Sequence, residues 1–262
     1  MAKQRTAAEM PFLDHLEELR WRILWSLAAL LVGVAIGFAI VAQGDVFKVL
    51  EAPIAPYLGG KKLVFTHPGD PFSIMMTASF GIGVVLALPV ILYQVWAFLS
   101  PALYPHEKRL MIPVVLGATL LFAAGVALSF FVVLPLTLGF LLRLHTESLE
   151  PMITAGDYFS FAVNTSLMFG VVFELPIAIL ALTALNIVTP QFLARFRRHA
   201  AVLCILLSAF ITPGQDIASL AALTLPLYFL YEVSVVLAYA IDRRRRRRAA
   251  AAEAGQYEGS AA

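Results

Sequence analysis

The sequence predicts an all-α polytopic membrane protein of six transmembrane helices. Hydrophobic residues make up 60% of the chain and charged residues only 14%, whereas soluble domains average about 45–50% and about 25%. The apolar residues gather in six runs, separated by short polar segments that are rich in proline, glycine and charge. The six spans are expected at residues 23–42, 72–99, 111–142, 158–185, 200–211 and 217–241.

The first span is preceded by a charged segment that is predicted to be helical from the spacing of its apolar residues. Within this segment Glu18 and Arg22 stand four positions apart, which predicts an ion pair on one helical face. Residues 23–42 contain no charge and match the about 20 residues that cross a hydrocarbon core. A cleaved signal peptide is not expected, because its apolar core would be only about 7–15 residues long. The apolar stripe consists of Phe12, Leu13, Leu16, Leu19 and Ile23.

A short hairpin loop, residues 100–110, joins the second and third spans. Aromatic residues, including Tyr93 and Trp96, precede this loop, and Glu107 stands within it beside the basic pair 108–109. Trp and Tyr favour the headgroup layer, and Lys and Arg in short loops mark the cytoplasmic side. The loop is too short for a domain of its own, so its polar groups are candidates for recognition.

The second half of the chain carries the less regular spans. The fourth span contains one charged residue, Glu174. The fifth is short for the hydrocarbon core, and we expect local thinning of the bilayer around it. Six consecutive arginines, Arg243 to Arg248, follow the sixth span and favour contact with anionic lipid. We therefore expect a membrane domain, residues 1–242, and a basic then disordered tail, residues 243–262.

Six spans put both termini on one side of the membrane, and the basic residues indicate which side. Only four of the 19 Lys and Arg residues lie in loops on the opposite side. Cytoplasmic loops carry the excess of Lys and Arg, so both termini are expected in the cytoplasm. The four exceptions are Lys48, Lys61, Lys62 and Arg143.

Leu-Pro pairs occur inside four of the spans, with prolines at positions 89, 135, 176 and 226. Proline removes a backbone donor and clashes with the preceding turn, so several of these helices are expected to be kinked. Kinked helices favour a bundle with a concave face over a straight one.

Four glutamates need an explanation. Glu174 lies mid-span, where a carboxyl group is costly unless it is neutral, paired or hydrated. It either fixes helix packing as a protonated group or offers a polar contact to a docking or passing chain. Glu18 and Glu107 lie at the cytoplasmic mouth, where each is either a solvated charge or one of two acceptors for a pair of guanidiniums. Glu232, near the end of the sixth span, is interpreted as reaching water.

The sequence carries no pattern for catalysis, a metal or a cofactor. It has no GxSxG, P-loop or HExxH motif, and its five histidines are scattered. A non-enzymatic protein is therefore expected. A secondary transporter or channel would concentrate polar groups at the midplane, around Glu174. The charged groups gather at the mouth instead, which favours a docking receptor, while a purely structural scaffold stays open.

Four motifs, which occur in order along nearly the whole chain, resemble the TatC family. They are PFLDHLEELRWRIL (residues 11–24), PVILYQVWAFLSPALYPHEKRL (89–110), GVVFELPIAIL (170–180) and ITPGQD (211–216). The resemblance implies the multispanning receptor of the twin-arginine (Tat) protein translocase in the cytoplasmic membrane of a prokaryote. Such a receptor binds the signal peptides of folded cargo proteins for export.

The resemblance also implies partners and site residues. The partners would be twin-arginine signal peptides, TatA-type and TatB-type single-span subunits, membrane lipid and further copies in an oligomeric receptor complex, with no nucleic acid. The proton-motive force would supply the energy. By the same resemblance Glu18 and Glu107 would form the twin-arginine site, and Glu174 would contact partners or the signal peptide. Supporting residues would be Leu16, Arg20 and Arg109.

Overall fold

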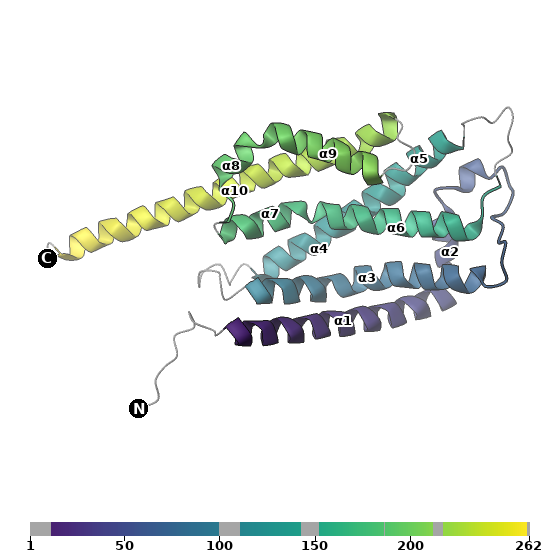
Figure 1. The fold of residues 1–262 in the computed structure, drawn as a ribbon, viewed down its shortest axis with the longest axis horizontal. Coiled ribbons are helices and arrows are strands. Elements are labelled where there is room, and N and C mark those ends of the chain that lie inside the picture. The colour runs from purple at the N-terminus through teal and green to yellow at the C-terminus, as the bar shows by residue number, and fades with distance from the viewer. Residues whose placement is uncertain (1–11, 100–110, 143–151, 186, 212–216, 261–262) are drawn as a thin grey trace.

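The computed structural model describes residues 12–99, 111–142, 152–185, 187–211 and 217–260 as an elongated helical bundle (Figure 1). Its elements are α1 (Phe12–Gln43), α2 (Val46–Glu51), the 3₁₀ turn η1 (Ala55–Tyr57), α3 (Asp70–Leu99), α4 (Met111–Leu128), the π-helical turn η4 (Ser129–Val133), α5 (Leu134–Leu141), α6 (Ala155–Phe173), α7 (Leu175–Ala184), α8 (Pro190–Arg195), α9 (Arg197–Ile211) and α10 (Ile217–Ser260). The predicted all-α class is confirmed.

The two ends of the bundle differ in charge. At one end, on the left in Figure 1, α1 begins, α3 and α7 end, α8 lies, and α10 runs outward. We call this the basic end, because the described arginines of α1, α8 and α9 are found there. They are Arg20, Arg22, Arg195, Arg197 and Arg198. The opposite end holds α2, η1 and the start of α6.

Five helical segments within the described residues are long and apolar enough to cross a membrane. They are Asp14–Gln43, Asp70–Leu99, Met111–Leu141, Ala155–Thr183 and Leu223–Arg243. The expected fifth span, residues 200–211, lies within α9, which has only 15 residues. A helix of that length rises about 22 Å, which is less than the about 30 Å of a hydrocarbon core. Length and composition therefore support five spans directly, and α9 is a short helix beside them.

The four Leu-Pro pairs have different effects on their helices. Pro89 and Pro226 lie inside the continuous helices α3 and α10. Pro135 follows the π-helical turn η4, and Pro176 follows the break between α6 and α7. Proline leaves a carbonyl of the preceding turn without its donor. Before Pro135 the helix widens into a π-helical turn, and before Pro176 the helix ends. The regular α-helical pattern is thus interrupted at two of the four positions, while the predicted kinks stay a prediction.

Glycines allow α1 to lie very close to α3. A β-carbon on Gly33 would be 2.5 Å from the carbonyl oxygen of Gly83, and one on Gly37 would be 2.5 Å from that of Ser79. Gly33 and Gly37 have the GxxxG spacing by which membrane helices approach each other closely. The sequence reading did not identify this motif. It explains how α1 is held by one face while most of its other apolar side chains are exposed.

A second close approach joins α4 to α6. A β-carbon on Gly125 would be 2.7 Å from the carbonyl oxygen of Phe169, and one on Gly170 would be 2.7 Å from the ring of Phe122. Phe122 and Phe169 are among the most deeply buried side chains of the described residues. The centre of the bundle is therefore filled by aromatic rings that lie against glycine.

The opposite end is closed by the segment between α1 and α3, which pairs with the start of α6. Val64 and Thr154 form an isolated parallel bridge, in which the Ala155 N–H donates to the Val64 carbonyl at 2.7 Å. The Tyr158 hydroxyl donates to the Leu50 carbonyl at 2.6 Å. The polar segment between α1 and α3 is therefore fixed to the bundle.

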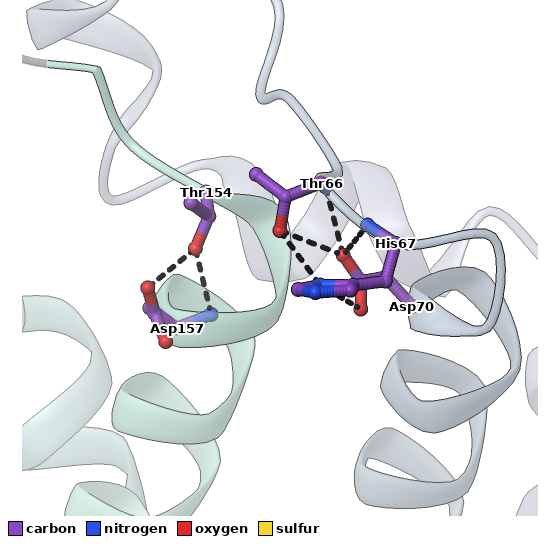
Figure 2. Close-up of polar contacts among 5 residues, drawn as sticks. All are labelled: Thr66, His67, Asp70, Thr154 and Asp157. Atoms are coloured by element: carbon purple, nitrogen blue, oxygen red, sulfur yellow. Dashed lines mark hydrogen bonds and ion pairs between the residues drawn. The ribbon is translucent and has the colours of Figure 1, made fainter.

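Two short-range caps start the helices at this end, as Figure 2 shows. The Thr154 hydroxyl donates to the Asp157 carboxylate at 2.6 Å and accepts the Asp157 N–H at 3.3 Å. The Asp70 carboxylate accepts the backbone N–H groups of Thr66 and His67, each at 2.9 Å. The bonds from the backbone N–H groups of Thr66, His67 and Asp157 satisfy donors at or just before a helix start, where no intrahelical partner exists.

At the basic end α10 packs against α7, α8 and α9. The Tyr231 hydroxyl of α10 donates to the Leu193 carbonyl of α8 at 2.7 Å. Glu232 forms an ion pair with Arg197 at 3.0 Å and accepts a hydrogen bond from Tyr228 at 3.0 Å. Glu232, interpreted above as reaching water, is 29% exposed and also ties α10 to α9.

Helix α10 continues through the six arginines to Ser260. The sequence predicted disorder after this basic run. Alanine and arginine are both strong helix formers, and they dominate the segment, which explains why the helix can continue.

Candidate functional site at the basic end

The Glu18 carboxylate lies between α1 and α3 at the basic end and is held by an arginine of its own helix. Arg22 Nε donates to Glu18 Oε1 at 2.9 Å, and Arg22 Nη2 donates to the same oxygen. Arg22 Nη1 donates to the Gln94 side-chain oxygen on α3 at 3.3 Å. The predicted ion pair is confirmed. Gln94 was missed, although it is an amide in an otherwise apolar span.

The second carboxylate oxygen of Glu18 has no hydrogen-bond donor among the described residues, although it is buried. His15 Nδ1 lies 3.6 Å from this oxygen. The His15 ring stacks on Phe98 of α3, with centroids 4.4 Å apart and an interplanar angle of 12°. A buried carboxylate oxygen without a donor is costly, and this oxygen keeps acceptor capacity that the described residues do not use.

Leu16 and Arg20 lie elsewhere on α1. Each is two positions from Glu18, and two helical positions are about 200° of rotation, so both project from the opposite face. Leu16 is 45% exposed and Arg20 is also exposed. The structure therefore does not bring these two supporting candidates to the Glu18 carboxylate.

Glu107 and Arg109 lie outside the described residues. The loop that contains them follows the end of α3 directly. Phe98, the residue before the last of α3, stacks on His15, so the described part of α3 ends beside the turn that carries Glu18.

Glu174 occupies the break between α6 and α7, where it ends one helix and precedes the other. Both of its carboxyl oxygens are buried, and neither has a hydrogen-bond partner within the described residues. Pro176 lies in the first turn of α7, so the break is fixed by the chain itself. The structure thus keeps a buried carboxyl group mid-span. If Glu174 fixed helix packing, it would need a hydrogen-bond partner, and none is found among the described residues.

An apolar groove lies between α3, α4 and α6, with a volume of about 210 Å³. Gly81, Val163 and Leu167 are among its lining residues, and its polar atom, Ser166 Oγ, is buried without a partner among the described residues. We call it the central groove. Val163, Leu167 and Glu174 recur at spacings of four and seven, which places them on one face of α6.

The fold and the distribution of charge define a class of protein: a polytopic helical membrane protein whose described arginines gather at one end. Comparison with known proteins identifies the family. The TatC family model, described as "Sec-independent protein translocase protein (TatC)", matches residues 14–226.

Curated relatives and solved structures agree with this match. Proteins named "Sec-independent protein translocase protein TatC" include one from Aquifex aeolicus, 38% identical over 90% of this chain and 97% of the relative. Another, from Escherichia coli K12, is 36% identical over 86% of each chain. A crystal structure described as "Twin Arginine Translocase Receptor- TatC" is 38% identical, with a TM-score of 0.72 over 86% of this chain and 98% of that one.

The chain belongs to the TatC family. It is therefore a component of the Sec-independent, or Tat, protein translocase and an integral protein of a bacterial membrane. Its relatives are named for protein translocation, which is a transport role and not a catalytic one. This identity decides between the classes that the sequence left open: it favours a translocase receptor over an ion transporter or a structural scaffold.

Proposed function

We propose that this protein binds the twin-arginine signal peptides of folded cargo at the basic end of the bundle. Glu18 and Glu107 accept the two guanidinium groups, and the apolar part of the signal lies against the bundle between Glu18 and the central groove. The protein then recruits TatA-type and TatB-type subunits into an oligomeric complex, and the proton-motive force drives export.

The observation that carries the proposal is the geometry of Glu18. Its carboxylate already holds one guanidinium, that of Arg22, and its buried Oε2 has no donor within the described residues. Charge-assisted hydrogen bonds from arginine to carboxylate are roughly twice as strong as neutral ones. The site therefore suits a guanidinium ligand chemically and has acceptor capacity left for one.

The position of the α3 end supports a second acceptor from the loop. α3 ends next to His15 and Glu18 through the stack of Phe98 on His15, and Glu107 follows eight positions after Leu99. Two carboxylates at the same mouth would match a pair of adjacent arginines. Arg20, Leu16 and Arg109 are proposed as outer contacts to the rest of the signal, since two of them are exposed on the far face of α1.

Glu174 would give the signal or a partner helix a polar contact at membrane depth. It shares a face of α6 with Val163 and Leu167 of the central groove. About ten residues of α7 separate it from the basic end, which is about 15 Å of helix. A chain that enters at Glu18 would thus meet Glu174 before the central groove, along a wall that we propose to be concave.

The orientation follows from charge. The basic end would face the cytoplasm with both termini, and α9 would complete six spans by crossing a locally thinned bilayer. Impermeant maleimide labelling of single cysteines, introduced after Cys204→Ser, tests the orientation. Lys61→Cys should react from outside intact cells and Arg195→Cys should not; the reverse pattern would refute this topology.

Site-specific crosslinking tests the proposed function. A photoreactive group placed next to the two arginines of a signal peptide should crosslink to the wild-type protein in membranes. The charge reversals Glu18→Lys and Glu107→Lys should each abolish the crosslink while the protein stays monodisperse in detergent. Wild-type crosslinking in both variants would refute the assignment.

A further inference from the structure

A second groove lies at the basic end, away from Glu18, between α8, α9 and α10. It has a volume of about 680 Å³, within the range of about 300–1,000 Å³ that is common for ligand sites. Two basic side chains at the start of α9, Arg198 and His199, line one end of it, which we call its mouth, and its other lining residues are almost entirely apolar. We call it the α9 groove.

The basic residues of the α9 groove lie at the end of the helix where the helix dipole disfavours positive charge. Arg197, Arg198 and His199 are the first three residues of α9, where the positive end of the helix dipole disfavours cations. Arg197 is compensated by Glu232 at 3.0 Å. Arg198 and His199 have no acidic partner in the part of the chain that the structure describes. The described residues therefore leave these two basic side chains without a counter-anion.

The walls of the groove lead from this mouth along α9. Val202 and Leu206 follow Arg198 at successive four-residue steps, and Leu203 follows His199 in the same way. All three apolar side chains are between 56% and 61% exposed. Residues at this spacing form one stripe, so a continuous apolar surface about 10 Å long begins directly below the two basic groups.

The other wall of the groove is built and fixed. Phe192 stacks on Phe196 with centroids 4.3 Å apart, and the Phe196 ring lies 4.9 Å from that of His199. The Tyr231 hydroxyl holds the Leu193 carbonyl at 2.7 Å. These contacts orient the His199 ring at the mouth and keep the groove open between α8 and α10.

We propose that the α9 groove binds one anionic phospholipid, with its phosphate at Arg198 and His199 and an acyl chain along Val202, Leu203 and Leu206. A phosphate supplies the missing anion and an acyl chain covers the apolar stripe, whereas a soluble anion would leave the stripe uncovered. Basic pockets between membrane helices are known to suit anionic headgroups. The inference is independent of signal-peptide binding, since the groove shares no residue with the Glu18 site.

Native mass spectrometry of the full-length protein in detergent tests the inference, with phosphatidylglycerol as the probe and phosphatidylcholine as its zwitterionic counterpart. The wild type should bind one phosphatidylglycerol more tightly than phosphatidylcholine. Arg198→Gln should lower the ratio of phosphatidylglycerol to phosphatidylcholine affinity about fivefold, as expected for one basic residue at an anionic headgroup. Arg195→Gln is the matched control, because Arg195 is exposed in the neighbouring helix and does not line the groove.

Leu203→Trp provides a second variant that keeps the charges and fills the groove. It should weaken phosphatidylglycerol binding without changing the monodispersity of the protein. Equal retention of both lipids by the wild type would mean unspecific lipid contact and would overturn the proposal. Equal losses in Arg198→Gln and Arg195→Gln would also overturn it, because the effect would then come from net charge alone.

Discussion

The guanidinium of Arg22 donates two hydrogen bonds to one oxygen of Glu18, and the other oxygen receives none from the described residues. The chain therefore has at its basic end a carboxylate of which one oxygen already accepts hydrogen bonds from an arginine. An incoming signal arginine would either share this carboxylate or displace Arg22 toward Gln94, to which Arg22 is also bonded.

Removal of this internal arginine should strengthen signal binding. Arg22→Gln leaves Glu18 without its competing cation, and partly exposed ion pairs are worth about 0.2–1 kcal/mol. We expect the affinity for a twin-arginine peptide to rise by up to about fivefold, measured by fluorescence anisotropy in detergent. Arg195→Gln, which removes a positive charge at the same end, should leave the affinity unchanged. A lower affinity in Arg22→Gln would indicate that Arg22 positions Glu18 and does not compete for it.

The glycine contact between α1 and α3 should be sensitive to volume. A leucine at Gly33 or Gly37 would collide with the backbone of α3, and overpacking costs about 1–3 kcal/mol. We expect Gly33→Leu to lower the thermal unfolding midpoint clearly. Gly117→Leu is the control, because a β-carbon there has no neighbour within 4 Å. Equal midpoints for the two variants would show that α1 is not held by this contact.

Glu232 and Glu174 should respond differently to the same substitution. Glu232 is paired with Arg197 and Tyr228, so Glu232→Gln should cost up to about 1 kcal/mol of stability. Glu174 has no partner among the described residues, and a carboxyl group at membrane depth costs about 2.5–3.5 kcal/mol on insertion scales.

Glu174→Gln should therefore leave the unfolding free energy unchanged or raise it, while export of a Tat reporter falls. Unfolding in detergent and export in cells are the two measurements. A destabilisation as large as that of Glu232→Gln would assign Glu174 a structural role in packing and remove it from the transport path.

The short helix α9 should thin the bilayer. Its 15 residues span about 22 Å, so spin labels at Arg198 and Phe210, one near each end of the helix, should both lie close to an interface. Depth measurements from oxygen and nickel accessibility would test this. A label at Phe210 buried near the midplane of an undisturbed bilayer would contradict it.

The sequence was informative about the spans because long uncharged runs have few alternatives in a membrane. It was also informative about Glu18 and Arg22, because a four-residue spacing on a helix places two side chains together. It could not identify Gln94 or the stack of His15 on Phe98, since these contacts join residues that are 72 and 83 positions apart in the chain.

Two further differences have local causes. Which proline distorts its helix depends on how the surrounding packing satisfies the freed carbonyl, and the four Leu-Pro pairs look alike in sequence. For the tail, the charge run favoured disorder, while its alanines and arginines favour the helix that α10 forms through this segment.

Recognition of the twin-arginine pair by Glu18 is the central claim, and a thermodynamic cycle tests it most directly. Binding of a synthetic signal peptide and of its Lys-Lys variant would be measured with the wild-type protein and with Glu18→Gln. Hydrogen bonds to charged groups are worth about 1.5–3 kcal/mol, so the wild type should prefer the arginine peptide by about tenfold or more. In Glu18→Gln most of that preference should vanish, because lysine lacks the guanidinium fork that the carboxylate receives. An undiminished preference for arginine in Glu18→Gln would contradict the claim.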